Sequence, residues 1–142
     1  MVEWLDVLPL GTVAETSKTF AEADAYLYAG IVGDFNSLYV NEPRAREAGL
    51  PGRVAPWAML GGCLGVVAME ITRPITPPGT VSVGYDLSFE LPIAHGDTIT
   101  TSFTLAEKNE ERQLLIFQVR FTNQRGEKVG EGKAYSKVTK PA

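Results

Sequence analysis

The sequence predicts an α+β domain in which a curved five-stranded antiparallel sheet wraps around one long central apolar helix. Two observations lead to this prediction. The stretch from Val54 to Ile71 carries no charge until Glu70, so a helix here must be covered on most of its sides. From Thr80 onward the apolar residues recur at every second position, which is typical of strands. The length of 142 residues favours a single domain over residues 1–142.

The chain before the apolar stretch is predicted to contain a strand and a helix. Residues 11–19 are expected to form a short strand. Thr19 followed by Glu22 fits a capping box at the start of a helix from about Phe20 to Gly30. The apolar residues in this region recur at helical spacing: Phe20, Ala23, Leu27 and Ile31.

A loop and a second short helix are expected next. Residues 33–37 break the helical pattern and are expected to form the loop. The residues 44–47 follow Pro43 and precede Gly49, which is typical of a short helix with a glycine stop.

The apolar stretch itself is expected to be the central helix. Pro56 suits the first turn of a helix, where its missing N–H is not needed. Three glycines within it, Gly61, Gly62 and Gly65, would let a backbone or a ligand come close. The helix is expected to end near Thr72, before a proline-rich connector over residues 73–79.

Four consecutive antiparallel strands are predicted after the connector. The first is expected to carry six apolar residues on one face: Val81, Val83, Tyr85, Leu87, Phe89 and Leu91. Further strands are expected from Ile99, Leu115 and Val129, after turns at residues 92–97, 108–112 and 123–126. Small residues on one face of the last strand would let the helix pack closely: Gly130, Gly132, Ala134 and Ser136.

Composition argues against several classes of function. The net charge of −4 and the absence of a basic run argue against nucleic-acid binding. The apolar helix is too short and too rich in glycine to span a membrane. A single cysteine and an amino terminus without signal-peptide features lead us to expect a cytoplasmic protein. No Cys/His cluster indicates a metal site, and His95, in the turn at 92–97, is expected to face solvent.

Two local segments resemble a known family. The segment from Ala25 to Asn41, with Gly-Asp-Phe-Asn at its centre, resembles the hydratase motif of MaoC-like, (R)-specific enoyl-CoA hydratases. Residues 52–60, Gly-Arg-Val-Ala-Pro-Trp-Ala-Met-Leu, resemble the start of the family's central helix, and residues 79–99 and 123–134 are also similar. The resemblance implies the hot-dog fold and an acyl-CoA thioester substrate, with no cofactor beyond that coenzyme A. It also implies a homodimer or higher homo-oligomer, with a heteromer as an alternative.

The resemblance also implies roles for individual residues. In that family an aspartate, and a histidine five residues later, activate a water molecule. Asp34 stands at the aspartate position, Asn36 matches the family's asparagine, and Tyr39 replaces the histidine. The thioester oxygen would accept hydrogen bonds from the backbone N–H groups of Trp57 and Ala58. The side chains of Trp57 and Arg53 are the implied substrate contacts.

Each of these residues also has a structural interpretation. Asp34 and Asn36 are common turn residues, and Tyr39 is compatible with a core aromatic position. Because tyrosine titrates near ~10, a catalytic Tyr39 would position water or donate a proton while Asp34 acts as the base. Arg53 is a candidate phosphate contact or a solvated residue. Three functions stay open: a hydratase or dehydratase, a non-catalytic partner subunit of a heteromeric hydratase, and an acyl-CoA thioesterase.

Overall fold

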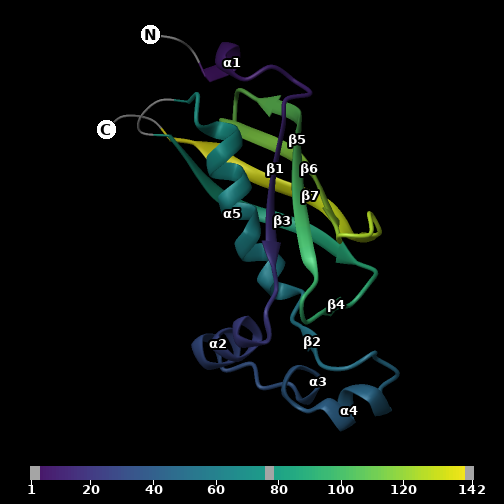
Figure 1. The fold of residues 1–142 in the computed structure, drawn as a ribbon. Coiled ribbons are helices and arrows are strands. Elements are labelled where there is room, and N and C mark those ends of the chain that lie inside the picture. The colour runs from purple at the N-terminus through teal and green to yellow at the C-terminus, as the bar shows by residue number, and fades with distance from the viewer. Residues whose placement is uncertain (1–3, 76–78, 140–142) are drawn as a thin grey trace.

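A computed structural model describes residues 4–75 and 79–139, and it confirms an antiparallel sheet packed against one long helix (Figure 1). The sheet has the strand order β1-β5-β6-β7-β3, and all neighbouring strands are antiparallel. Its members are β1 (Val13–Thr19), β3 (Thr80–Phe89), β5 (Thr98–Asn109), β6 (Leu114–Thr122) and β7 (Lys128–Val138). Helix α5 (Ala58–Thr72) lies across one face. This is the hot-dog arrangement that the sequence predicts.

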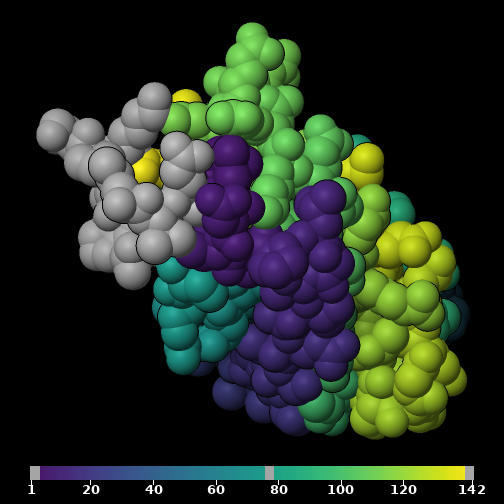
Figure 2. Space-filling model, turned by 90° about the horizontal axis from the view of Figure 1, so that it is seen from above, coloured from purple at the N-terminus to yellow at the C-terminus, as the bar shows by residue number. Residues whose placement is uncertain are grey.

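The core lies between α5 and the sheet. Apolar residues three or four positions apart form the buried side of α5: Leu60, Leu64, Val67 and Ile71. The sheet contributes three fully buried rings to the same cluster, namely Phe103, Phe117 and Phe121. Figure 2 shows β1, in purple, lying between α5 and the green strands, so β1 covers a further side of the helix.

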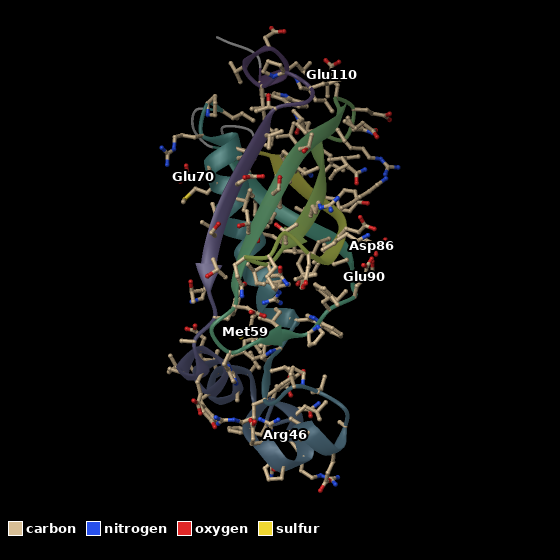
Figure 3. The ribbon with its side chains drawn as sticks, turned by 45° about the vertical axis from the view of Figure 1, so that its right-hand side comes forward. Arg46, Met59, Glu70, Asp86, Glu90 and Glu110 are labelled. Atoms are coloured by element: carbon tan, nitrogen blue, oxygen red, sulfur yellow. The ribbon has the colours of Figure 1, made fainter. Side chains whose placement is uncertain are left out.

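Three short helices lie beyond one end of the sheet, at the end where α5 begins (Figure 1). They are α2 (Glu22–Val32), α3 (Ser37–Val40) and α4 (Glu42–Glu47). Figure 3 shows this relation through Met59, in the first turn of α5, and Arg46, further out on α4. Helix α1 (Trp4–Val7) lies at the opposite end. The loop with Asp34 is therefore on the same side of the molecule as the amino end of α5.

Helix α2 differs from its prediction in its cap and in its end, which is Val32 rather than Gly30. Thr19 belongs to β1 and its hydroxyl hydrogen-bonds that of Thr98, so the helix starts two residues later than a Thr19 cap requires. The Asp24 carboxylate instead accepts the backbone N–H of Ala21 at 2.8 Å. The apolar residues that recur at helical spacing do not form a buried face of this helix: Leu27 and Ile31 are 64% and 81% exposed. The buried residues of α2 are two alanines, Ala25 and Ala29.

The start of the central helix also differs from its prediction. Val54 and Ala55 form β2 (Val54–Ala55), which pairs with β4 (Ile93–Ala94) inside the predicted turn at 92–97. Backbone pairing therefore delays the helix to Ala58, and Pro56 precedes its first turn. The predicted connector at 73–79 contains residues 76–78, which lie outside the described residues.

A β-bulge divides β3 and overturns the prediction of six alternating residues on one face. The register with β7 shifts between Ser82 and Gly84, so Val83 is the extra residue. Opposite residues of an antiparallel pair lie on the same face. Ser82 is opposite the buried Ser136, whereas Tyr85 is opposite the buried Ala134. Thr80, Ser82, Tyr85, Leu87 and Phe89 therefore face α5, while Val81 and Val83 are on the other face.

The glycines of β7 make room for β3 rather than for the helix. A Cβ at Gly132 would lie 1.9 Å from the backbone carbonyl oxygen of Asp86, and one at Gly130 would lie 2.6 Å from that of Ser88. Both distances are shorter than any real contact of a Cβ, so the close approach of the two strands requires glycine. Within residues 4–75 and 79–139, no helix is long and apolar enough to cross a membrane.

Candidate active site

A cavity of about 560 Å³ lies between the first turns of α5 and the inward face of β3. Its walls come from α3, from the start of α5 and from β3. The lining residues are Tyr39, Trp57, Ala58, Gly61, Tyr85, Asp86, Leu87 and Phe89. Three of the predicted site residues, Tyr39, Trp57 and Ala58, therefore meet at one cavity.

The amino end of α5 presents unpaired backbone donors to this cavity. The N–H groups of Met59 and Leu60 bond to the carbonyls of Pro56 and Trp57. In the described part of the chain, no hydrogen bond engages the N–H groups of Trp57 and Ala58. A helix start with free N–H groups carries a partial positive charge, so it favours an oxygen that gains negative charge beside it.

The indole of Trp57 packs against the end of β3 and does not block the amino end of α5. Its ring stacks on Phe89 with a centroid distance of 5.5 Å and an interplanar angle of 10°. Its Nε1–H donates to the carbonyl oxygen of Leu91 at 2.8 Å. The two contacts hold the ring against one wall, so Ala58 and Gly61 stay accessible as lining residues.

Tyr39 lies at the cavity with a hydroxyl group that remains protonated. Burial raises the pKa of this hydroxyl above its ordinary value of 10.0, and the negative charge of Asp34 raises the pKa further. Among the described residues, no side chain or carbonyl hydrogen-bonds to the Tyr39 hydroxyl. The hydroxyl of this lining residue therefore has no described hydrogen-bond partner, which favours a free donor over a hydroxyl satisfied by a protein group.

Asp34 lies beside Tyr39 but does not line the cavity itself. It directly follows Gly33, which ends α2 in the left-handed conformation with φ 78°. Asp34 is half-buried, and its Oδ1 accepts only a long hydrogen bond, 3.4 Å, from the backbone N–H of Asn36. Among the described residues, no basic side chain forms an ion pair with this carboxylate. The negative charge of this carboxylate is one of the causes that raise the pKa of Tyr39, after burial.

Asn36 caps α3. Its side-chain oxygen accepts the backbone N–H of Leu38 at 3.0 Å, as asparagine does at many helix starts. The cap fixes the backbone that carries Tyr39 one turn later. The structure therefore supports the structural interpretation of Asn36, and its side chain is not among the residues that line the cavity.

Arg53 is engaged with carboxylates from two helices and does not line the cavity. Its guanidinium lies 2.5 Å from a carboxylate oxygen of Glu22 and also donates to the Tyr26 hydroxyl. Its backbone N–H and Nε reach one oxygen of Glu42, at 2.9 and 3.4 Å. Arg53 thus ties α2 to α4.

The contribution of β3 to the cavity is not predicted from the sequence. Tyr85, Leu87 and Phe89 form one wall, and the hydroxyl oxygen of Tyr85 lies 2.9 Å from the place that a Cβ of Gly61 would take. The alternation of Tyr85, Leu87 and Phe89 was visible in the sequence. The neighbour that they face, Gly61, was also noted as a position of close approach, but no sequence signal joined the two.

His95 does not face solvent as expected. Both ring nitrogens are buried, and neither has a hydrogen-bond partner among the described residues. No described hydrogen bond joins His95 to Asp34 or Tyr39, and nothing in the structure explains its burial. Within residues 4–75 and 79–139, no group of three or more His, Cys, Asp or Glu side chains is arranged to hold a metal ion.

Comparison with known proteins places this site in context. Residues 9–125 match the sequence profile of the family described as MaoC like domain. An (R)-specific enoyl-CoA hydratase from Rhodospirillum rubrum is 29% identical over 134 residues, which cover 94% of this chain and 90% of that protein.

Solved structures show the same fold. The (R)-hydratase from A. caviae involved in PHA biosynthesis matches with a TM-score of 0.83 and 23% identity, over 94% of this chain and 99% of that one. The R-hydratase PhaJ1 from Pseudomonas aeruginosa, in its unliganded form, matches with a TM-score of 0.77 and 29% identity, over 94% and 84% of the two chains.

Proposed function

This chain belongs to the MaoC-like domain family, and on that basis we propose that it is a hydro-lyase that adds water to, or removes it from, a 2-enoyl-CoA thioester. The related proteins named as enoyl-CoA hydratases support this reaction class. The assignment to coenzyme A thioesters and the roles of individual residues are our proposal.

The observation that carries the proposal is the pair of unpaired N–H groups at Trp57 and Ala58, which open into the same cavity as Tyr39. When water adds to an enoyl thioester, the thioester oxygen gains negative charge as the enolate forms. Two fixed N–H donors stabilise that charge without reorganisation, which is the largest contribution in many enzymes. A flat thioester that accepts both bonds would lie between α5 and β3.

Asp34 is proposed as the base. The oxygen of a water molecule bonds to the β-carbon of the thioester while a proton of that water passes to the Asp34 carboxylate. The C=C electron pair moves toward the thioester oxygen and gives the enolate. The enolate then takes a proton at its α-carbon from the protonated Asp34, which returns the carboxylate to its starting state. Dehydration is the reverse sequence.

Tyr39 is proposed as a neutral donor that holds the attacking water. Its raised pKa keeps the phenol protonated, so it does not remove a proton itself. Asn36 holds the loop by capping α3. Trp57 contributes its N–H and a wall of the cavity, and Arg53 holds the helices around the site. As a phosphate contact Arg53 would first have to release a carboxylate.

The test compares Asp34→Asn with Asp6→Asn, a control at the opposite end of the molecule. Wild type and control are expected to consume the absorbance of an enoyl-CoA thioester without releasing thiol. Asp34→Asn is expected to lose about 100-fold or more in kcat at an unchanged melting temperature. Thiol release by the wild type would indicate a thioesterase, and full activity of Asp34→Asn would remove Asp34 from the mechanism.

A non-catalytic partner subunit is the second candidate, and the replacement of the expected histidine by Tyr39 is the observation that favours it. Such a subunit would show no hydration alone and would gain it only with a second, different chain. Hydration by the purified homogeneous protein excludes this candidate.

A homodimer joined along β3 is also part of the proposal. The described sheet has two edges, β1 and β3. Edge strands that remain unpaired usually carry charges. β1 carries two charged residues, Glu15 and Lys18, whereas β3 carries one, Asp86, together with the exposed Val81 and Val83. Val83→Lys on β3 is expected to give monomers in light scattering, while Val13→Lys on β1, at a site of similar exposure, leaves the dimer intact. A monomeric wild type would contradict this.

A further inference from the structure

Two hollows lie in sequence along the groove between α5 and β3. The first is the cavity at the amino end of α5, with Ala58 and Gly61. The second, of about 300 Å³, lies further along and includes Gly65 and Ala68 of α5 and Ser82 of β3. Both are on the α5 side of β3, whereas pairing with another strand would use the backbone edge of β3.

Tyr85 stands between the two hollows. On β3 it lies between Ser82, which lines the second hollow, and Leu87, which lines the first. Its ring faces α5 because the bulge at Val83 turns the strand. Its hydroxyl end meets α5 at Gly61, one turn before Gly65.

The contact depends on the missing side chain of Gly61. A Cβ at that position would lie 2.9 Å from the Tyr85 hydroxyl oxygen and 3.2 Å from Cζ, so any larger residue would push the ring aside. By contrast, a Cβ at Gly65 would meet nothing within 4 Å. The Tyr85 ring therefore approaches α5 closely at Gly61, whereas the space next to α5 at Gly65 is open.

The ring is held by little else. Tyr85 is 59% exposed, and no hydrogen bond to its hydroxyl is formed in the described part of the chain. A side chain with this exposure contributes little to folding, so its removal should change the groove more than the stability. This makes its effect on ligands separable from its effect on the fold.

We propose that Tyr85 is a specificity-determining residue that confines the acyl chain to the first cavity and so selects short enoyl groups. This inference rests on the function proposed above. Ala58 and Gly61 are about 4.5 Å apart along the helix axis, which is the length of about three or four chain carbons. If the thioester is held at the N–H of Ala58, its acyl chain would therefore reach the Tyr85 ring within three or four carbons. The second hollow lies on the far side of that ring.

The experiment measures kcat/KM for trans-2-enoyl-CoA thioesters with four and eight carbons. The wild type is expected to prefer the shorter one. Tyr85→Ala is expected to raise the kcat/KM of the eight-carbon thioester relative to that of the four-carbon thioester by about tenfold or more. Hydrophobic pockets discriminate to about this extent between substrates that differ by one or two methylene groups. Tyr85→Phe keeps the ring and should keep the preference. Val13→Ala, at a similarly exposed residue of β1, should change neither ratio nor rate.

A second variant tests the hollow itself. Gly65→Leu in the Tyr85→Ala background would fill the second hollow, and the preference for the short thioester should return. An unchanged ratio in Tyr85→Ala overturns the proposal, as does the same shift in Tyr85→Phe.

Failure of the underlying function is recognised separately. If the wild type hydrates no thioester, the proposed reaction is wrong, and calorimetric binding of saturated butanoyl-CoA and octanoyl-CoA then decides about Tyr85. If Tyr85→Ala binds octanoyl-CoA more tightly relative to butanoyl-CoA than the wild type does, the proposed role of Tyr85 is supported. An unchanged ratio, or no binding of either compound, overturns it.

Discussion

Replacing Tyr39 by phenylalanine separates two roles for its hydroxyl by the size of the effect. The structure gives a phenol that lines the cavity, has no described hydrogen-bond partner and has a raised pKa. Even with a pKa of 10, only about 1% of the phenol would be ionised at pH 8. We therefore expect the proposed role of this group to be that of a donor and not that of a base.

The expected magnitude follows from that role. Removing one neutral hydrogen bond costs about 0.5–1.5 kcal/mol, which corresponds to about a twofold to tenfold loss of kcat. Removing a general base would cost about 100-fold or more. Tyr39→Phe is accordingly expected to lose about twofold to tenfold in the absorbance assay. The melting temperature should hold, because the ring stays in place.

The pH profile provides the second measurement. If the neutral phenol is the active form, the ratio of wild-type to Tyr39→Phe rates stays constant between pH 6 and 9. Tyr39→His introduces a group that titrates near ~6.5, so its rate should rise through that pH as the imidazole becomes neutral and able to accept a proton. A 100-fold loss in Tyr39→Phe, or a ratio that climbs with pH, would refute the donor role. Equal rates would show that the hydroxyl has no chemical role.

Other consequences of the structure can be measured on stability. The backbone N–H of Arg53 lowers the pKa of Glu42, so the stabilisation is complete above the ordinary value of 4.5 and is lost as the pH falls through the lowered value. Glu42→Gln should therefore show a smaller drop in melting temperature between pH 7 and 3 than the wild type, and an equal drop would contradict this. Gly132→Ala places a Cβ 1.9 Å from a carbonyl oxygen and should lower the free energy of unfolding, measured in urea, by about 3 kcal/mol or more. Gly62→Ala, which places its Cβ in open space, should raise that free energy by up to about 1 kcal/mol. Trp57→Ala loses a ring stack and a hydrogen bond and should cost about 2 kcal/mol, and Trp57→Phe about half of that; equal losses would show that the indole N–H contributes nothing.

The parts of the fold that local patterns determine were predictable. The uncharged stretch after Pro56 predicts the central helix, and the side of it that faces the sheet is buried as expected. The expectation that the helix is covered on most of its sides is wrong for the single chain, because Val66 and Met69 on the opposite side are 49% and 60% exposed. The strands from Ile99 onward follow the period of two, and their apolar residues are buried as expected. In both cases the signal lies within the element itself.

The parts decided by distant partners were not predictable from one sequence. The bulge at Val83 is a property of the pairing between β3 and β7, and the alternation of apolar residues in β3 does not reveal it. The isolated Gly84 beside the bulge is a residue that often marks one, but by itself it does not fix the register. The burial of α2 through two alanines, with Leu27 and Ile31 outside, reverses the usual inference that apolar residues lie inside.

The candidate site shows the same division. The loop that carries Asp34 and the presence of a helix start near Pro56 follow from local sequence, although α2 ends at Val32 rather than near Gly30 and α5 begins only at Ala58. The direction of the Trp57 ring does not, because its partners Phe89 and Leu91 are more than thirty positions away. Tyr85 reaches the cavity only because the bulge turns its strand.

The stacked indole of Trp57 gives the cavity an optical reporter. The protein has two tryptophans, and the other, Trp4, lies in α1 at the far end of the molecule (Figure 1). In a Trp4→Phe background the emission would come from the cavity wall alone. Its wavelength would then register the exchange of water for an acyl chain beside the ring, and stopped-flow mixing could follow ligand entry in a protein that performs no turnover.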